Sequence, residues 1–142
     1  EAVNTIVWDE TIGGWRGHNT DYDGMKAISS HIGPDDRVAV WGGGGTRAVI
    51  QARIPQARFH SVRQGGDPSD DPTVLVWAVS RDRAVNAPPK SFHPRIVLDL
   101  NYAEDSPGRA FAKELGCAYV SGLAMFKAQA RAQRAFWEGY IR

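Results

Sequence analysis

The chain has 142 residues, which is the size of a single ordinary domain. Hydrophobic residues make up 42% and charged residues 23%, so a packed core can form and wholesale disorder is excluded. The net charge of +1 gives no reason to expect a nucleic-acid or membrane partner. The single cysteine, Cys117, excludes an internal disulfide and a cysteine zinc cage, and we expect a reducing, cytoplasmic environment. The four histidines lack metal-ligand spacing, so no metal site is predicted.

The first twenty residues predict a short hairpin. Residues 5–8 and 14–18 have strand-like composition on either side of a turn at 9–13. The chain opens directly on this strand, without an initiator methionine. A strand needs a partner, and residues 14–18 offer only a weak one. We therefore expect a piece of a longer polypeptide.

Strands and helices alternate through the rest of the chain. The patterns predict helices at 21–32, 46–53, 107–115 and 123–137, and strands at 37–41, 57–62, 74–79, 96–100 and 118–120. Continuous apolar strands separated by helices are typical of a parallel sheet covered on both faces. The predicted fold class is therefore α/β: a Rossmann-like, doubly wound, mostly parallel sheet with helices on both faces. Ligands in this architecture bind at the carboxyl ends of the strands.

A run of four glycines follows the first of these strands. Without Cβ atoms the turn can be tight, and a pyrophosphate can lie against its backbone N–H groups. The helix that follows adds roughly half a positive charge at its N-terminus. This context predicts a dinucleotide site at Gly42, Gly43, Gly44, Gly45 and Thr46, with a sharp structural turn as the alternative.

The end of the second strand indicates which nucleotide binds. NAD-binding domains commonly carry an acid there for the ribose hydroxyls. Here the strand ends in Val62-Arg63, with no acid at its tip. A guanidinium suits a 2′-phosphate, so Arg63 favours NADP over NAD, with a solvated surface arginine as the alternative.

Two polar positions have both a structural and a functional interpretation. Asp21 opens a helix and could simply cap it, or its carboxylate could handle a proton or a substrate hydroxyl. Gln129 shares a helical stripe with Met125 and Phe136. A buried glutamine there needs a partner, and the alternative is a glutamine at the stripe edge in water.

Several short motifs occur in one order: Asn4-Thr5, Asn19-Thr20-Asp21-x-x-Gly24, the glycine turn, Asp99-x-x-Tyr102 and Gly122-Leu123-x-Met125-x-x-x-Gln129-Ala130. In this order and spacing they resemble the carboxyl-terminal, NADP-binding portion of the shikimate dehydrogenase family. The resemblance covers nearly all of the chain but only part of the family's length. It implies the reversible NADPH-dependent reduction of 3-dehydroshikimate to shikimate, within aromatic amino acid biosynthesis. Residues 1–20 would end the substrate-binding domain as a hinge hairpin, and 21–142 would form the NADP-binding domain.

The resemblance also implies roles for matching positions. Asn4 and Asp21 would hydrogen-bond substrate hydroxyls, with Thr20 beside them, and Asp21 would be half of a catalytic Lys–Asp pair. Tyr102 would lie near the substrate carboxylate, and Gln129 would reach a substrate hydroxyl. The implied cofactor residues beyond the glycine turn are Arg63, Ala78, Ser80, Gly122 and Met125. Tyr102 and Met125 have the alternative of being ordinary core side chains.

The chain departs from the family pattern mainly on the cofactor side. The Asn-Arg of the family appears as Val62-Arg63, and residues 64–72 form a polar loop in place of a helix. The family's catalytic lysine belongs to the amino-terminal domain, and no lysine of this chain matches it. We therefore expect the chain to be inactive alone, and fusion to or assembly with other shikimate-pathway domains is open.

The sequence is also compatible with two other functions. One is a non-catalytic, dehydrogenase-like module for regulation or assembly, favoured by the altered cofactor side. The other is a different Rossmann oxidoreductase, for which Asn4, Asp21 and Gln129 should not converge in one place.

Overall fold

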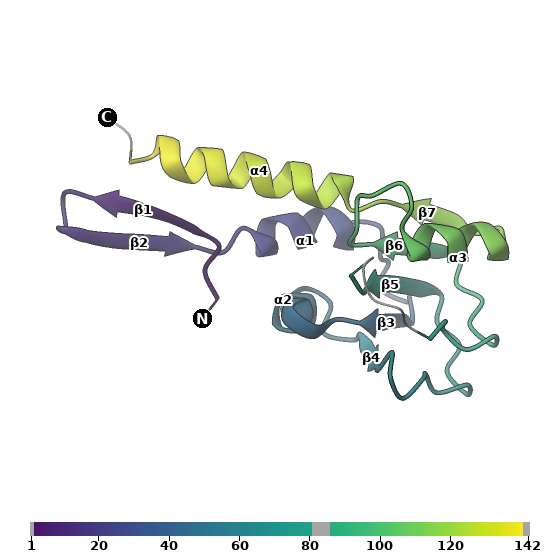
Figure 1. The fold of residues 1–142 in the computed structure, drawn as a ribbon. Helices are drawn as coiled ribbons and strands as arrows, with labels where there is room; N and C mark the ends of the chain where they lie inside the picture. Colours follow the sequence, from purple (N-terminus) through teal and green to yellow (C-terminus); the bar gives the residue numbers. More distant parts are fainter. Residues whose placement is uncertain (1, 81–85, 141–142) are drawn as a thin grey trace.

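The computed structural model describes residues 2–80 and 86–140. Within these residues the strands form two separate sheets, a two-stranded hairpin and a five-stranded parallel sheet. Figure 1 shows the hairpin extending from the body of the molecule, alongside the end of the longest helix. The predicted α/β class, with helices on both faces of a parallel sheet, is confirmed.

The hairpin consists of β1 (Thr5–Asp9) and β2 (Gly14–His18), which pair antiparallel with Trp8 opposite Trp15. Asp9 organises its turn by accepting hydrogen bonds from the backbone N–H and the hydroxyl of Thr11. These bonds and the Arg16 guanidinium lower the pKa of Asp9 to about 2. The carboxylate therefore holds both ends of the hairpin turn together.

The parallel sheet has the order β4-β3-β5-β6-β7. The strands are β3 (Val38–Gly42), β4 (Arg58–His60), β5 (Val74–Ala78), β6 (Ile96–Asp99) and β7 (Ala118–Val120). The chain passes from β3 to β4 on one side, then crosses to β5 on the other side of β3. The strand order therefore reverses between β3 and β5, which is where open α/β sheets bind ligands.

Alternating side chains on the strands fill two cores. One face packs against α1 (Asp21–Ser29), α2 (Arg47–Arg53) and α4 (Leu123–Glu138), which contribute Met25, Ile28, Val49, Ile50 and Met125. The other face packs against α3 (Pro107–Leu115) and the segment before β6 through Trp41, Leu75, Trp77, Phe92 and Ala112. Burial on both faces explains why the strands read as continuous apolar runs.

Helix α3 has clear start and stop signals in the sequence. The Ser106 hydroxyl caps it by accepting from the Gly108 N–H, Pro107 takes the first helical position, and Gly116 ends it with a φ of +64°. Because each signal is local, the predicted bounds 107–115 are confirmed to the residue.

Helices α1 and α4 lie side by side (Figure 1). A Cβ at Gly24 of α1 would lie 2.7 Å from Gln129 Cγ and 2.8 Å from Met125 Cγ, so glycine permits this close approach. At its far end α4 contacts the hairpin, because the Trp137 indole donates to the Ile6 carbonyl at 3.1 Å and Phe136 stacks on His18. Helix α4 thus joins the hairpin to the sheet.

Several predicted boundaries differ from the structure, most of them by one residue, and three of the differences have a clear local cause. The strand predicted at 57–62 ends at His60, because a turn closed by a Ser61–Gly65 bridge follows it. The helix predicted at 46–53 starts at Arg47, after a 3₁₀ turn η1 (Gly44–Thr46). The first helix ends at Ser29, where the Ser29 and Ser30 hydroxyls bond back to carbonyls of the last turn.

Candidate functional site

The glycine turn lies at the reversal of strand order. Gly42 and Gly43 have φ values of +91° and +101°, which side-chain-bearing residues rarely adopt. A Cβ at Gly42 would lie 2.9 Å from the Ala78 carbonyl oxygen, and the Gly43 N–H donates to that same oxygen at 3.0 Å. These two glycines therefore fix the turn tightly against the end of β5.

The next two glycines face open space. A Cβ at Gly44 or Gly45 would meet nothing within 4 Å, so no described side chain fills the space beside them. The turn opens on a cavity of about 630 Å³ that includes most of the predicted cofactor residues. Its lining comprises residues 42–47, 59–64 and 78–80, among them Arg63, Ala78 and Ser80. The alternative of a purely structural turn accounts for Gly42 and Gly43 but not for the open side at Gly44 and Gly45.

The charged side chains of this cleft are basic. Arg47 and Arg63 line it, and none of the described residues lining it is an aspartate or glutamate. The sequence predicts Arg63 at the tip of the second strand. In the structure it lies in the turn after β4, three residues beyond the last residue of that strand. Neither arginine is in an ion pair with an acid within the part of the chain that the structure describes. The cleft is therefore suited to an anionic ligand.

A buried pair supports the turn that carries Arg63. His60 Nε2 lies 2.9 Å from Asp70 Oδ2, and both side chains are almost fully buried. His60 Nδ1 accepts from the Asp67 N–H at 3.3 Å, so the Nε2 atom carries the proton that it donates to Asp70. The loop from Ser61 to Asp70 is thereby tied back to β4. Scattered histidines in the sequence gave no sign of this role.

A second group of polar side chains gathers at the start of α1. The Asp21 carboxylate oxygen Oδ1 accepts from Asn4 Nδ2 at 3.0 Å and from Gln129 Nε2 at 2.5 Å. These three residues come from the segment before β1, from α1 and from α4. In a different Rossmann oxidoreductase we expect these three residues to lie apart. Their convergence therefore argues against that alternative.

Thr20 completes this cluster, and the capping interpretation of Asp21 is wrong. Asn4 Oδ1 accepts from the Thr20 N–H at 3.0 Å and from the Thr20 hydroxyl at 3.1 Å. Thr20 occupies the N-cap position of α1 without a side-chain cap, and Asp21 is the first helical residue. The Asp21 carboxylate is directed at the two amides instead. Gln129 is partly exposed but has the partner that a buried glutamine needs, so the interpretation as a solvated stripe-edge residue is also wrong.

Other predicted site residues lie apart from this cluster. Tyr102 is 61% exposed and its ring packs on Phe126, so it is not a core residue. Gly122 is buried with its Cα against the Leu100 carbonyl, and a Cβ there would collide with that oxygen. Met125 is buried in the core against Gly24, as its structural alternative expected. The cofactor roles of Gly122 and Met125 stay predictions.

The aspartate of the Asp99-x-x-Tyr102 motif is a structural hub. Asp99 is fully buried, and its carboxylate accepts from Asn101, Ser106 and Tyr119. Burial and this neighbouring carboxylate raise the pKa of Tyr119. Asn101 Nδ2 also donates to the Val79 carbonyl at 2.8 Å, at the edge of the cleft. The motif thus holds the loop after β6 in place.

Two further residues of the cleft were not predicted from the sequence. The Arg47 guanidinium lies over the Phe59 ring, with its central carbon 4.3 Å from the ring centroid, and both residues line the cavity.

No group of metal-ligating side chains occurs among the described residues. None of the helices in residues 2–80 and 86–140 is long and apolar enough to span a bilayer.

The strand order and the glycine turn at its reversal define a Rossmann-like α/β domain. Among solved structures, this fold is similar to that of shikimate dehydrogenases. A shikimate 5-dehydrogenase-like protein aligns with a TM-score of 0.74 and 22% identity, over 98% of this chain and 61% of its own. Shikimate dehydrogenase 1 from Peptoclostridium difficile aligns with a TM-score of 0.74 and 19% identity, over 99% of this chain and 62% of its own.

A third similar structure is shikimate 5-dehydrogenase from Thermus thermophilus in complex with NADP(H) and shikimate. It has a TM-score of 0.66 and 22% identity, over 97% of this chain and 62% of its own. No protein-family model and no curated protein matches the sequence. The chain spans about three fifths of the length of these structures. At these identities the likeness establishes the fold, and the resemblance inferred from the motifs is confirmed at that level.

Proposed function

We propose that this chain is the NADP-binding portion of a shikimate dehydrogenase, which interconverts 3-dehydroshikimate and shikimate. The convergence of Asn4 and Gln129 on the Asp21 carboxylate carries this proposal. Asn4 and Gln129 belong to motifs at opposite ends of the chain, and these motifs occur in the order that the resemblance requires. In the folded chain the two side chains meet at one carboxyl group. The Thermus thermophilus structure of the same fold was solved with NADP(H) and shikimate, which supports the proposal.

The cleft residues fit NADP. The space beside Gly44 and Gly45 lets a pyrophosphate approach bare backbone, and Arg63 offers a guanidinium for the 2′-phosphate. Among the described lining residues there is no acid to repel that phosphate. When bound, the nicotinamide would supply the hydride that reduces the ketone.

The Asp21 cluster would hold the substrate. Asp21 Oδ1 is engaged by two amides, whereas Asp21 Oδ2 has no hydrogen-bond partner within the described residues. Oδ2 is thus free to accept from a substrate hydroxyl and to take part in the proton transfer that accompanies hydride transfer. Asn4 and Gln129 fix the carboxylate, which is the positioning that such a step needs.

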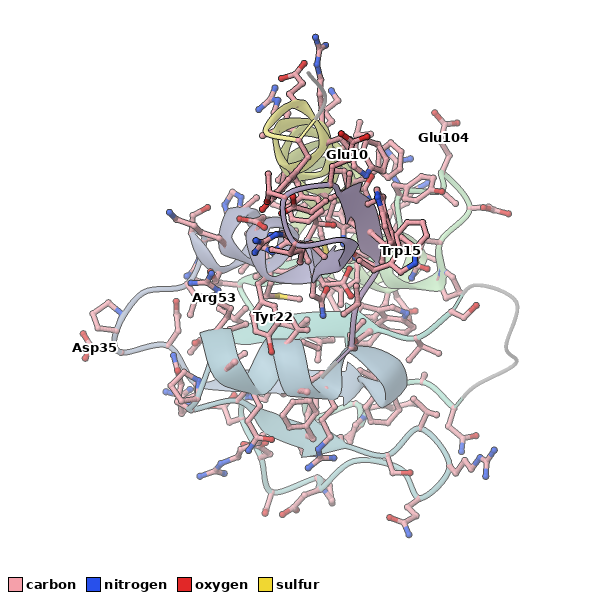
Figure 2. All side chains as sticks on the ribbon, turned by 90° about the vertical axis from the view of Figure 1, so that its left-hand side faces the viewer. Glu10, Trp15, Tyr22, Asp35, Arg53 and Glu104 are labelled. Atoms are coloured by element: carbon pink, nitrogen blue, oxygen red, sulfur yellow. The ribbon has the colours of Figure 1, made fainter. Side chains whose placement is uncertain are left out.

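We extend the proposal to the domain arrangement: residues 1–20 end a substrate-binding domain, and residues 21–142 form the NADP-binding domain. Within the described residues β1 and β2 pair only with each other, and the side that bears Ile6, Trp8 and Trp15 is exposed. Figure 2 shows Trp15 on the side of the hairpin away from α1. The aligned structures extend well beyond this chain, so a substrate-binding domain would cover this apolar side.

The partners follow from this arrangement. Shikimate or 3-dehydroshikimate would bind between the substrate-binding domain and the Asp21 cluster. One aligned structure, from Clostridium acetobutylicum, is a fusion of chorismate mutase with shikimate 5-dehydrogenase, so fusion to a pathway domain has a precedent in this fold.

Calorimetry with NADPH, followed by a turnover assay with NADPH and 3-dehydroshikimate, tests this function. We expect micromolar binding that is lost in Arg63→Ala, and no turnover by the chain alone because the lysine of the catalytic pair is missing. Absence of NADPH binding would contradict the proposal and favour a non-catalytic regulatory or assembly module. Robust turnover by this chain alone would contradict the proposed division of the active site.

A further inference from the structure

A second arginine stands in the proposed nucleotide cleft, together with the turn that carries Arg63. Arg47 is the first residue of α2, directly after the glycine turn, and its guanidinium lies over Phe59 with its central carbon 4.3 Å from the ring centroid. Both side chains line the 630 Å³ cavity. Cation–π contact with an aromatic ring stabilises such an arrangement even at exposed sites.

The aromatic ring that supports Arg47 is itself fixed in place. Phe59 lies on β4, and a Cβ at Gly43 would lie only 3.1 Å from its ring atoms Cδ1 and Cε1. The ring is therefore held between the glycine turn and the guanidinium. This places Arg47 between the turn that would bind the pyrophosphate and the end of β4, where the adenosine ribose of a dinucleotide lies in this architecture.

Among the described residues, the acids near the cleft are engaged with groups other than Arg47 and Arg63. Asp70 is engaged by His60 and Arg58, and Asp67 accepts from Ser69. Within residues 2–80 and 86–140, no carboxylate forms an ion pair with Arg47 or Arg63. Two positive charges thus face one cavity, and a ligand with a dianionic group is their natural complement.

The contact with Phe59 leaves the N–H donors of the Arg47 guanidinium available. The central guanidinium carbon of Arg47 lies over the Phe59 ring, and within the described residues none of its N–H groups donates a hydrogen bond to the protein. These donors are the groups that bind phosphate oxygens. An arginine without such a ring contact would have to be ordered on binding, whereas Arg47 is already held over Phe59.

We propose that Arg47 is a specificity-determining residue that, together with Arg63, binds the ribose 2′-phosphate and so sets the preference for NADPH over NADH. Phe59 is the positioning residue that orients Arg47. This inference rests on the proposed function of the cleft as a dinucleotide site, and it names a second arginine and its aromatic support as the determinants of the phosphate preference.

Isothermal titration calorimetry of the 142-residue chain with four probes tests this role. The probes are NADPH, NADH, adenosine 2′,5′-bisphosphate and AMP. We expect Arg47→Ala to weaken NADPH and the bisphosphate by roughly tenfold or more, the scale of a lost charged hydrogen bond, and to leave NADH and AMP within about twofold. Phe59→Leu should give a smaller loss in the same direction. Arg53→Ala, at the opposite end of α2, is the matched control and should change nothing.

The outcomes separate this proposal from the function of the cleft. Equal losses for phosphorylated and unphosphorylated probes in Arg47→Ala, or no loss for any probe, would overturn the role of Arg47 while leaving the dinucleotide site standing. If the unaltered chain bound none of the probes, both proposals would fail. Thermal melting of each variant shows that it is folded, which we expect because Arg47 is exposed.

Discussion

Single residues decide whether the glycine turn folds and whether it can receive a ligand. Gly42 has a positive φ and its backbone meets the Ala78 carbonyl, so it is needed for the fold. Gly44 has open space where a side chain would be, and it lines the cleft, so it is needed only for the ligand. The two glycines therefore form a matched pair for mutation.

Alanine at these two positions should have opposite effects. Gly42→Ala should destabilise the fold by about 1–3 kcal/mol, because a side chain is strained at this φ and would collide with β5. Gly44→Ala should leave the urea midpoint unchanged but weaken NADPH binding by roughly tenfold, or about 1.4 kcal/mol. Urea unfolding and calorimetry of both variants check this, and a destabilised Gly44→Ala with intact binding would show that the open space has no ligand.

Residue types differ in how far their roles could be predicted from the sequence. Asp21, Asn4 and Gln129 were assigned together only through the order of the motifs, because periodicity placed Gln129 on a stripe without identifying its partner. Arg47 was not assigned, since its partner Phe59 belongs to a different element and the two meet only in the folded chain. Local patterns carry no information on such contacts.

At the scale of elements, the packing of α1 on α4 positions the proposed substrate cluster. The absence of a side chain at Gly24 allows Met125 and Gln129 to approach α1, and Gln129 then reaches Asp21 at 2.5 Å. Gly24→Ala should push the helices apart, lower the free energy of unfolding by about 1–3 kcal/mol and separate Gln129 from Asp21. Gly33→Ala is the control, because its Cβ would meet Asp36 Oδ2 at an ordinary 3.5 Å. Equal stability of both variants in urea would contradict the close approach.

A second link between elements depends on pH. Asp36, in the loop before β3, accepts from Arg95, from the Gly33 N–H at 2.7 Å and from the Thr73 hydroxyl at 2.7 Å. The Arg95 guanidinium, followed by the Gly33 N–H, holds the pKa of Asp36 well below its usual range. The carboxylate therefore stabilises the fold above the unfolded pKa of roughly 4, and this contribution is lost as pH falls toward the folded value.

The Asp36→Asn variant should show this window directly. At pH 7 it should be less stable than the unaltered chain, and the difference should shrink as the pH is lowered from roughly 5 to 2.5. Urea midpoints at a series of pH values measure it. Asp35→Asn, at the exposed neighbouring residue, should instead stay parallel to the unaltered chain. A difference for Asp36→Asn that is independent of pH would rule out the ionic contribution.

Elements with local signals were predicted most accurately. The bounds of α3 follow from Ser106, Pro107 and Gly116, and β7 was placed at 118–120 as observed. The end of β4 was placed too late, because the turn that ends it is held by His60, Asp67 and Asp70, whose contacts span up to ten residues. Boundaries set by tertiary contacts are beyond what local patterns can show.

On the scale of the whole molecule, two separate polar regions share one Rossmann-like sheet. The glycine cleft lies at the reversal of strand order, and the Asp21 cluster lies where α1 and α4 meet the hairpin (Figure 1). The central claim is that the first region binds NADP. Among the described residues, a competing site for a ligand is a second cavity of about 540 Å³ between α3 and β7, lined by residues that include Glu104, Arg109, Lys113 and Tyr119.

Titration of the ¹⁵N-labelled chain with NADPH, followed by two-dimensional NMR, distinguishes these two regions most directly. The proposed function predicts that the largest amide shifts fall on residues 42–47, 61–64 and 78–80, with small changes on α3. Shifts concentrated on residues 104–119 around the second cavity, or no shifts at millimolar NADPH, would contradict it.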